Sequence, residues 1–136
     1  MIEARGLAPL LQVYDMPTAV RFYRDKLGFE IVTTSPPLGG ADRFHWCLLR
    51  LGDAELMLNT AYEFDDQRPS REEHNQVRGH YDTCLFISCP DVDGAYNQLM
   101  ERGLDLKPPA VAPYGMKQLY LMDPDGFGLC FQWQAD

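Results

Sequence analysis

The chain lacks any hydrophobic run long enough to cross a membrane, and its start does not have the pattern of a signal peptide. Uninterrupted apolar stretches are only a few residues long, whereas a membrane-spanning helix needs about 20 apolar residues. The N-terminal segment carries charges at Glu3 and Arg5 and has no apolar run of the length that a signal peptide needs. We therefore expect a soluble, cytoplasmic protein that has no membrane partner.

Positive charge is also scarce. There are 12 Lys and Arg against 20 Asp and Glu, so the formal net charge is -8 and the isoelectric point is near 4.7. The basic residues are scattered along the chain and form no stripe. Nucleic acid and anionic membranes are therefore not expected as partners. A small molecule or another protein is favoured.

The cysteines do not form a motif. Cys47, Cys84, Cys89 and Cys130 include no CxxC pair and do not have the spacing of a secreted disulfide scaffold. Reduced thiols in a cytosolic protein are the expectation, and we expect at least two of them to fill core space. A phosphate-binding loop is also missing, because Gly39-Gly40 is not followed by Lys and Ser or Thr.

The order of predicted elements occurs twice. With 136 residues and 46% hydrophobic content, the chain has the size of one domain or of two half-domains that share a core. For a first half at residues 5–62, alternation and helical spacing predict a helix at 17–27 and strands at 7–14, 29–34, 43–51 and 55–59. For a second half at residues 81–134, they predict a helix at 92–102 and strands at 81–89, 104–107, 117–122 and 128–134. Residues 63–80 are polar and without periodicity, and we interpret them as a linker.

Both predicted helices have recognisable ends. Asp15 and Asp91 occupy N-cap positions, and Gly28 and Gly103 supply the C-terminal stops. Apolar residues at helical spacing predict the buried stripes, which are Met16, Ala19, Val20, Tyr23 and Leu27 on the first helix and Ala95, Tyr96, Leu99 and Met100 on the second. The caps of the two halves are about 75 residues apart, so we infer a degenerate duplication.

Short motifs within this pattern resemble a known family. They are Val13-Tyr-Asp15, Ala19-Val-Arg-Phe-Tyr23, Leu27-Gly-Phe29, Asp91-Val-Asp93 with Ala95-Tyr96, and Asp123-Pro-Asp-Gly126. In their order and duplicated spacing they resemble the vicinal oxygen chelate (VOC) superfamily, which includes glyoxalases, bleomycin-resistance proteins and dioxygenases. The resemblance implies a single α+β domain, residues 1–136, of two βαβββ modules whose sheets form an open, barrel-like cleft.

The same resemblance raises the question of a metal. Superfamily members that act as lyases, epimerases or dioxygenases hold a divalent metal through His, Gln or Glu on the first and last strands of each module. The two-residue period of a strand projects these positions onto Ala8, Met57, Cys84 and Cys130. None of them offers the nitrogen or oxygen donors that suit such metals. The chain therefore resembles the metal-free, bleomycin-resistance-like branch, and we expect no cofactor.

Other interpretations stay open. A two-residue error in register would place Glu55 or Asn59, and Asp82 or His80, in the cleft, which would suit a metal-dependent lyase, isomerase or dioxygenase. A third possibility is an interaction module whose cleft is filled by its own side chains. Whether the chain catalyses a reaction is thus undecided by the sequence.

Two cysteines and a histidine permit a further alternative. Cys84 and Cys130 would suit a thiolate zinc site, with His45 as the only obvious nitrogen donor, but two thiols do not make four ligands. His45 also lies opposite Gln118 when the halves are aligned, so a polar pair there would be able to hold a ligand. The simpler interpretation is a hydrogen-bonded strand histidine.

Our leading hypothesis is a metal-independent small-molecule-binding protein that sequesters an aromatic or amphipathic compound. Aromatic residues make up 12% of the chain, and a cleft without a metal would hold its ligand by stacking and a few polar anchors. The predicted cleft residues are Gln12, His45, Trp46, Met57, Asn59, Cys84, Tyr114, Gln118, Tyr120, Cys130 and Gln132. A homodimer is expected, because modules are able to pair between chains and symmetric dimers are common.

Overall fold

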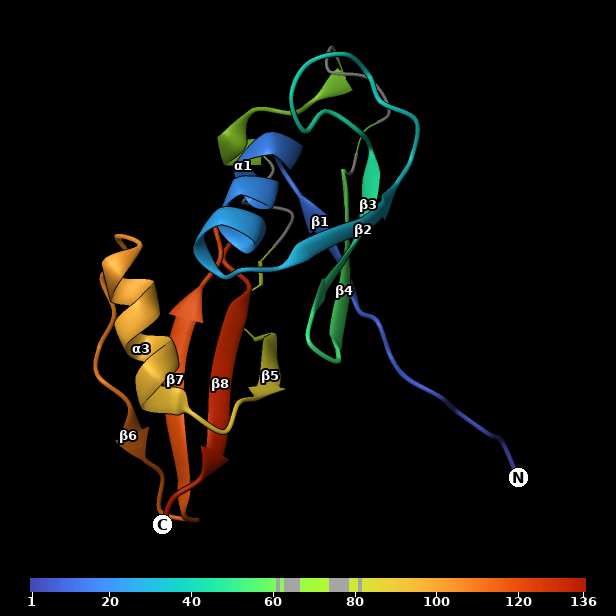
Figure 1. The fold of residues 1–136 in the computed structure, drawn as a ribbon. Coiled ribbons are helices and arrows are strands. Elements are labelled where there is room, and N and C mark those ends of the chain that lie inside the picture. The colour runs from blue at the N-terminus through green and yellow to red at the C-terminus, as the bar shows by residue number, and fades with distance from the viewer. Residues whose placement is uncertain (61, 63–66, 74–78, 81) are drawn as a thin grey trace. The chain divides into compact units, whose positions relative to one another are not determined.

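The computed structural model describes residues 1–60, 62, 67–73, 79–80 and 82–136. The chain divides into two compact units, Met1–Arg71 and Glu72–Asp136, which run from blue to green and from yellow to red in Figure 1. Each unit contains a four-stranded sheet with a helical segment between its first and second strands, in the order βαβββ. The predicted α+β class and the duplication are therefore confirmed.

The first module pairs its first and last strands at one side of the sheet. Its elements are β1 (Leu10–Val13), the α-helix α1 (Met16–Val20), the π-helix η1 (Arg21–Lys26), β2 (Glu30–Thr34), β3 (Trp46–Leu51) and β4 (Ala54–Thr60). The strand order is β1-β4-β3-β2, with β1 parallel to β4 and the other pairs antiparallel. A parallel pair needs a crossover connection, to which the helical segment belongs.

The helical segment of the first module begins at the predicted cap but is not a continuous α-helix. Asp15 accepts hydrogen bonds from the backbone N–H of Thr18 at 3.1 Å and from its hydroxyl at 2.6 Å. From Arg21 onward the turn widens, and the N–H of Leu27 reaches the carbonyl of Phe22, five residues back, at 3.1 Å. The predicted helix at 17–27 is confirmed, and its second half has the wider hydrogen-bond pattern of a π-helix. Apolar spacing indicates which side chains are buried, and it does not distinguish these two hydrogen-bond patterns.

The buried face of the first sheet packs against this helical segment. Alternate strand residues are buried, namely Leu11, Val13, Cys47, Leu49, Leu56 and Leu58. The predicted helical stripe is buried in full at Met16, Ala19, Val20, Tyr23 and Leu27. The ring of Tyr23 packs edge-on against Phe22 and Phe29, with ring centroids 5.3 and 5.7 Å apart. The chain turns away at Gly28, whose φ of +93° would strain any residue with a Cβ.

The second module repeats the arrangement. Its elements are β5 (Cys84–Ser88), α3 (Val92–Glu101), β6 (Ala110–Val111), β7 (Met116–Met122) and β8 (Gly128–Gln134). The strand order is β5-β8-β7-β6, with β5 parallel to β8. The helix α3 packs on β7 and β8, as Figure 1 shows. Each sheet thus has one face covered by its own helix, and we call the opposite face the helix-free face.

The ends of α3 follow the predicted chemistry. Asp91 caps the helix by accepting the N–H of Gly94 at 2.9 Å. At the other end Gly103 has a φ of +91°, and the N–H of Leu104 bonds the carbonyl of Leu99 at 3.1 Å. Leu99 is buried as predicted, but Met100 is 39% exposed. Its predicted inward position is wrong, because its sulfur instead accepts the N–H of Leu106 at 3.5 Å, on the segment that follows the helix.

Several strands begin later than predicted. Strand β1 begins at Leu10, after Pro9, which has no N–H to donate. Strand β3 begins at Trp46, because the hydroxyl of Ser35 accepts the N–H groups of His45 and Trp46, each at 3.1 Å.

The strand predicted at 104–107 is absent among the described residues of that segment, and β6 lies three residues beyond it. Pro108 and Pro109 cannot donate to a ladder. Pairing with β7 accordingly starts at Ala110, opposite Gln118, and continues at Val111, opposite Lys117.

Residues 63–66 and 74–78 of the predicted linker at 63–80 lie outside the described residues, but Arg68 has a defined position. Its guanidinium pairs with Asp15 at 2.9 Å and lies 5.0 Å from the ring centroid of Tyr14. Arg71 also lies over Tyr14, at 4.8 Å. This segment is therefore attached to the β1–α1 junction of the first module. No helix among the described residues is long and apolar enough to traverse a bilayer.

Candidate ligand-binding site

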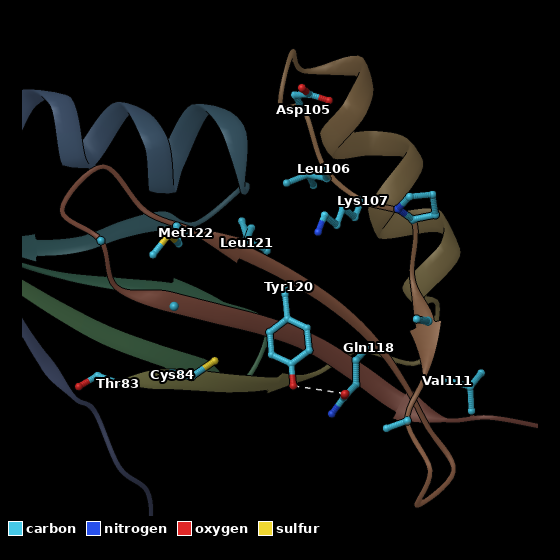
Figure 2. Close-up of a pocket in the computed structure, with 15 residues that line it drawn as sticks. Thr83, Cys84, Asp105, Leu106, Lys107, Val111, Gln118, Tyr120, Leu121 and Met122 are labelled. Atoms are coloured by element: carbon cyan, nitrogen blue, oxygen red, sulfur yellow. Dashed lines mark hydrogen bonds between the residues drawn. The ribbon is translucent and has the colours of Figure 1, made fainter. Parts of the chain in front are cut away.

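A pocket of about 720 Å³ is lined by residues of the second sheet and of the segment that follows α3 (Figure 2). It is bounded by β5, β7 and the segment that connects α3 to β7. Its wall is mainly apolar and includes Leu106, Val111, Leu121 and Met122. Pockets that bind small molecules commonly have volumes of roughly 300 to 1,000 Å³ and apolar walls with a few polar groups. The size and lining of this pocket are those of a ligand site.

Strand alternation places the polar groups of the pocket. On β7, Leu119 and Leu121 are buried toward α3, so Gln118, Tyr120 and Met122 belong to the helix-free face. Tyr120 is 52% exposed and Met122 is 62% exposed. An exposed aromatic ring and a thioether on the pocket wall provide a surface on which a flat apolar molecule is able to stack.

Gln118 is buried at the centre of a hydrogen-bond network on this face. Its amide nitrogen donates to the hydroxyl of Tyr114 at 2.9 Å and to the side-chain oxygen of Gln132 at 3.0 Å. Its amide oxygen accepts the hydroxyl of Tyr120 at 3.2 Å (Figure 2). Both donor hydrogens and the oxygen of this amide are thus engaged, which is what burial of an amide demands. The amide is held in place by three partners.

Two cysteines lie beside this network. Cys84 on β5 is exposed and lines the pocket, whereas Cys130 on β8 is buried and pairs with Tyr120 in the strand register. Burial raises the pKa of both thiols above the ordinary value. A Cβ added at Gly128 would lie 3.4 Å from the sulfur of Cys84, so the absence of a side chain there leaves room for the thiol. The pocket therefore presents a neutral thiol at physiological pH.

Three of the predicted cleft residues of the first module, Gln12, Asn59 and Trp46, share one row across its sheet. The register places Gln12 beside Asn59 and Asn59 beside Trp46, and Met57 follows in the next row beside Leu10. The amide oxygen of Asn59 is buried and has no hydrogen-bond partner. This row is the counterpart of Ser88, Gln132 and Gln118 in the second module.

His45 lies outside that row. Its Nδ1 is 3.2 Å from the hydroxyl of Thr60, which donates its own proton to the carbonyl of Tyr62 at 2.8 Å. Nδ1 therefore carries a proton and donates to Thr60. The strand register pairs Trp46 with Asn59 and Gln118 with Gln132, so the counterpart of Gln118 is Trp46. The predicted alignment of His45 with Gln118 is wrong by one residue, because the sequence did not show where β3 begins.

The projected metal positions do not supply a hard donor set. Ala8 precedes β1 and has no donor, and Met57, Cys84 and Cys130 offer a thioether and two thiols of raised pKa. No group of three or more His, Cys, Asp or Glu side chains gathers among the described residues. These residues do not fit the nitrogen and oxygen donor sets that hold divalent metals in enzymes.

The off-register donors do not gather at one point among the described residues. Glu55 pairs with Arg50 at 3.0 Å. His80 stacks on Phe127 with ring centroids 3.8 Å apart, and its Nε2 is buried without a partner. Asp82 is exposed. A histidine stacked on a buried phenylalanine packs as a core residue would.

Sequence comparison now identifies the family. Residues 7–131 match the profile of the glyoxalase/bleomycin resistance protein/dioxygenase superfamily. The chain belongs to this superfamily, as its motifs indicated. No curated protein matches the chain in sequence.

Solved structures share the fold at low sequence identity. A glyoxalase/bleomycin resistance protein/dioxygenase from Nocardioides has a TM-score of 0.72 and 18% identity, and the match covers 100% of this chain and 87% of that one. TnmS3, an antibiotic binding protein from Streptomyces sp., has a TM-score of 0.69 and 23% identity over 99% and 100% of the two chains. A bleomycin-binding protein in complex with bleomycin has a TM-score of 0.66 and 21% identity over 98% and 100%. The chain shares their fold.

Proposed function

We propose that this chain is a metal-independent small-molecule-binding protein that sequesters an aromatic or amphipathic compound in the pocket of its second module. The observation that carries the proposal is the pocket of about 720 Å³, whose apolar wall surrounds Tyr120 and the buried amide of Gln118. An apolar site with a few convergent polar groups is typical of ligand binding. Among the described residues there is no accompanying cluster of His, Cys, Asp and Glu that would indicate a metal-dependent reaction.

The fold neighbours support a binding function. One is described as an antibiotic binding protein, and another is described as a bleomycin-binding protein with bleomycin bound. Because they are only 23% and 21% identical to this chain, they do not identify its ligand. The choice of an aromatic or amphipathic compound rests on the pocket itself, where Tyr120, Val111 and Met122 are all more than half exposed.

The exposed thiol of Cys84 provides the test. Its rate of alkylation by iodoacetamide would be followed by mass spectrometry while a panel of aromatic and amphipathic compounds is added to the whole protein. A ligand in the pocket should slow the modification of Cys84 and leave that of Cys89, which does not line the pocket, unchanged. At 100 times its dissociation constant such a ligand should also stabilise the protein by about 2.7 kcal/mol. If no compound protects Cys84, the pocket is not the ligand site.

The metal-independent part of the proposal has a separate test. Protein purified without chelators should contain no stoichiometric zinc, iron, nickel or manganese, and ligand protection of Cys84 should be the same with and without EDTA. The described residues contain no group of three or more His, Cys, Asp or Glu side chains, which supports this expectation. Metal that remains at one equivalent after dialysis would revive the alternative of a metal-dependent lyase, isomerase or dioxygenase.

We propose that the helix-free face of the first module, taken by itself, also contacts small molecules. Gln12, Trp46, Met57 and Asn59 lie there, and the unpartnered oxygen of Asn59 supports a role in holding a polar group. We propose in addition a cytoplasmic location, which suits four free cysteines. A homodimer completes the proposal, and sedimentation of a species of 15.5 kDa at micromolar concentration would remove it.

A further inference from the structure

The edge strand of the second sheet is much shorter than its counterpart in the first sheet. In the first module β2 has five residues and pairs with β3 from its first residue to its last. In the second module β6 has only two residues, Ala110 and Val111. The residues before it are Pro108 and Pro109, which have no N–H groups with which to continue the ladder. The outer edge of β7 is therefore open beyond its short pairing with β6.

Hydrogen bonds at the two ends of β7 show which backbone groups face this open edge. Ala112 donates its N–H to the carbonyl of Met116 at 2.8 Å, so even-numbered residues of β7 face β6. The N–H of Asp123 bonds across the β7–β8 turn at 2.9 Å, so odd-numbered residues face β8. The N–H and C=O of one strand residue point to the same side, and successive residues alternate. Tyr120 and Met122 thus direct their backbone groups toward the open edge.

Among the described residues, no backbone hydrogen bond reaches this edge at Tyr120 or Met122. If β6 extended toward its N-terminal side, Pro108 would lie opposite Tyr120 and Leu106 opposite Met122. Pro108 has no N–H, and the N–H of Leu106 is directed to the sulfur of Met100 at 3.5 Å. The pocket of about 720 Å³ is lined by residues on both sides of this gap (Figure 2).

We infer that the pocket takes a short extended peptide, which pairs with the open edge of β7 through the backbone groups of Tyr120 and Met122. The inference rests on the proposed function, because it names the class of amphipathic compound that the same pocket holds. Residues rise about 3.4 Å each along an antiparallel strand, so three peptide residues reach both positions. Strand addition gives affinity through main-chain hydrogen bonds and leaves the peptide side chains for the apolar wall.

Charges on the opposite wall favour one direction for the peptide. Asp105 and Lys107 line the pocket, and neither has an ion-pair partner among the described residues. Because β6 is antiparallel to β7, a peptide in line with it has its C-terminus toward Ala110. Lys107 is nearer to Ala110 in the chain than Asp105 is, so its ammonium suits the C-terminal carboxylate. The segment that carries these charges closes the far side of the gap, which suits a short free peptide better than the edge strand of a second protein.

Three tripeptides test the backbone pairing by calorimetric titration of the whole protein. The parent is N-acetyl-Val-Phe-Val with a free carboxylate, and two analogues carry an N-methyl group on the second or on the third residue. In the register that reaches both open positions, the third N–H faces β7 and the second faces away. Methylation of the third residue should weaken binding about tenfold, as the loss of one hydrogen bond allows. Methylation of the second should change it less than about twofold.

Amide hydrogen exchange of the protein gives an independent readout. NMR of isotopically labelled protein should show slower exchange at Tyr120 and Met122 when the parent peptide is bound. Leu119 and Leu121 are the internal reference, because their amides already face β8 and should not change.

Two lysines separate the carboxylate contact from general charge. Lys107→Gln should weaken the parent peptide several-fold, because it removes the only basic side chain that lines the pocket. The matched control is Lys117→Gln, whose ammonium pairs with Asp93 at 2.7 Å and does not line this pocket. It should leave the dissociation constant unchanged.

The two prolines provide a matched pair for the gap itself. Pro108→Val restores an N–H on the side that faces Tyr120, so β6 should lengthen and the peptide should lose about tenfold in affinity. Pro109→Val restores an N–H that faces away from β7, so binding should stay the same. Exchange protection of the new amide at position 108 shows whether the strand has lengthened.

Several results would overturn the inference. They are absence of peptide binding, unchanged exchange at Tyr120 and Met122, equal losses from the two N-methyl groups, unchanged binding in Lys107→Gln, and full binding in a Pro108→Val variant whose strand has lengthened. The proposed function survives each of them if aromatic or amphipathic compounds still protect Cys84 from alkylation. If neither the peptides nor those compounds protect Cys84, the proposed function fails as well.

Discussion

The two modules share a sheet topology but differ in the chemistry of their helix-free faces. In the second module the amides of Gln118 and Gln132 satisfy each other within a network that includes two tyrosines. In the first module the corresponding row contains Trp46 and Asn59, and the buried oxygen of Asn59 has no partner. The covered faces, in contrast, are alike, because both bury alternating aliphatic residues against a helix. The duplicated fold thus fixes the core, while the helix-free faces are able to diverge.

Matched truncations of the two cores should have the largest effect. Leu56 on β4 and Leu129 on β8 occupy corresponding positions, at 3% and 0% exposure. Each change to Ala should lower the free energy of unfolding by about 2 to 5 kcal/mol, because it removes buried contacts and leaves a cavity. Urea denaturation measures both. A loss below about 1 kcal/mol in only one module would show that the covered faces are not equivalent.

Replacing the two buried amides by leucine should have effects of opposite sign. Gln118→Leu removes an amide whose hydrogen bonds are all made, and should cost about 1 to 3 kcal/mol. Asn59→Leu removes a buried oxygen that has no partner, and should be neutral or stabilise by about 1 kcal/mol. Thermal and urea unfolding of both variants provide the comparison. Equal destabilisation would mean that Asn59 is hydrogen-bonded in solution.

Removing either helix cap should lower the free energy of unfolding by a smaller amount, and the two losses should differ slightly. Asp91→Ala removes a cap that bonds Gly94, and should cost about 1 kcal/mol. Asp15→Ala removes a cap that bonds Thr18 and also pairs with Arg68, so it should cost a few tenths of a kcal/mol more. The matched control is Arg68→Met, whose effect should become smaller in the Asp15→Ala background, where only its contacts with aromatic rings remain. Independent, additive losses would show that the ion pair contributes nothing.

The same carboxylate should make the first cap sensitive to acid. Burial alone would raise the pKa of Asp15, but hydrogen bonds from Thr18 and the guanidinium of Arg68 outweigh it and hold the pKa below the ordinary value of 3.8. A carboxyl group whose pKa is lower in the folded state stabilises that state fully above the unfolded pKa, and this contribution is lost as the pH falls through the folded pKa. The stability difference between wild type and Asp15→Asn should therefore narrow below pH 3.8. If the difference in unfolding free energy between wild type and Asp15→Asn stays the same down to about pH 2, the pKa of Asp15 is not lowered in the folded state.

Sequence periodicity predicted the fold well because burial follows it directly. The helix caps at Asp15 and Asp91, the stops at Gly28 and Gly103 and the core position of Leu99 are all confirmed. Cys47 and Cys130 fill core space as expected. Strand starts were less predictable, because they depend on which backbone N–H groups are available or already bonded, as at Pro9 and Ser35.

The sequence predicted several residues of the candidate site, but it did not predict the hydrogen bonds between them. Alternation placed Cys84 in the predicted cleft, the alignment of the two halves placed Gln118 there, and Tyr120 was among the aromatic residues expected around it. The structure brings these three to one pocket. The bond from Gln118 to Tyr114 depends on the turn before β7, whose geometry no periodic pattern encodes. The apolar contribution of Leu106 was missed, because residues 104–107 were taken for a strand. Pro108 and Pro109, which follow this segment, indicated that it would not pair as a strand.

The ion pair between Arg68 and Asp15 indicates where the first half of the chain ends as a folding unit. The strands of the first half end at Thr60, yet its first helix cap is completed by a side chain eight residues further on. A half-length polypeptide that stopped at the last strand would lack this cation and leave Tyr14 without the two guanidinium groups above its ring. A separately produced first half therefore needs to extend through Arg71, and the segment after its last strand belongs to that half as part of its folding unit.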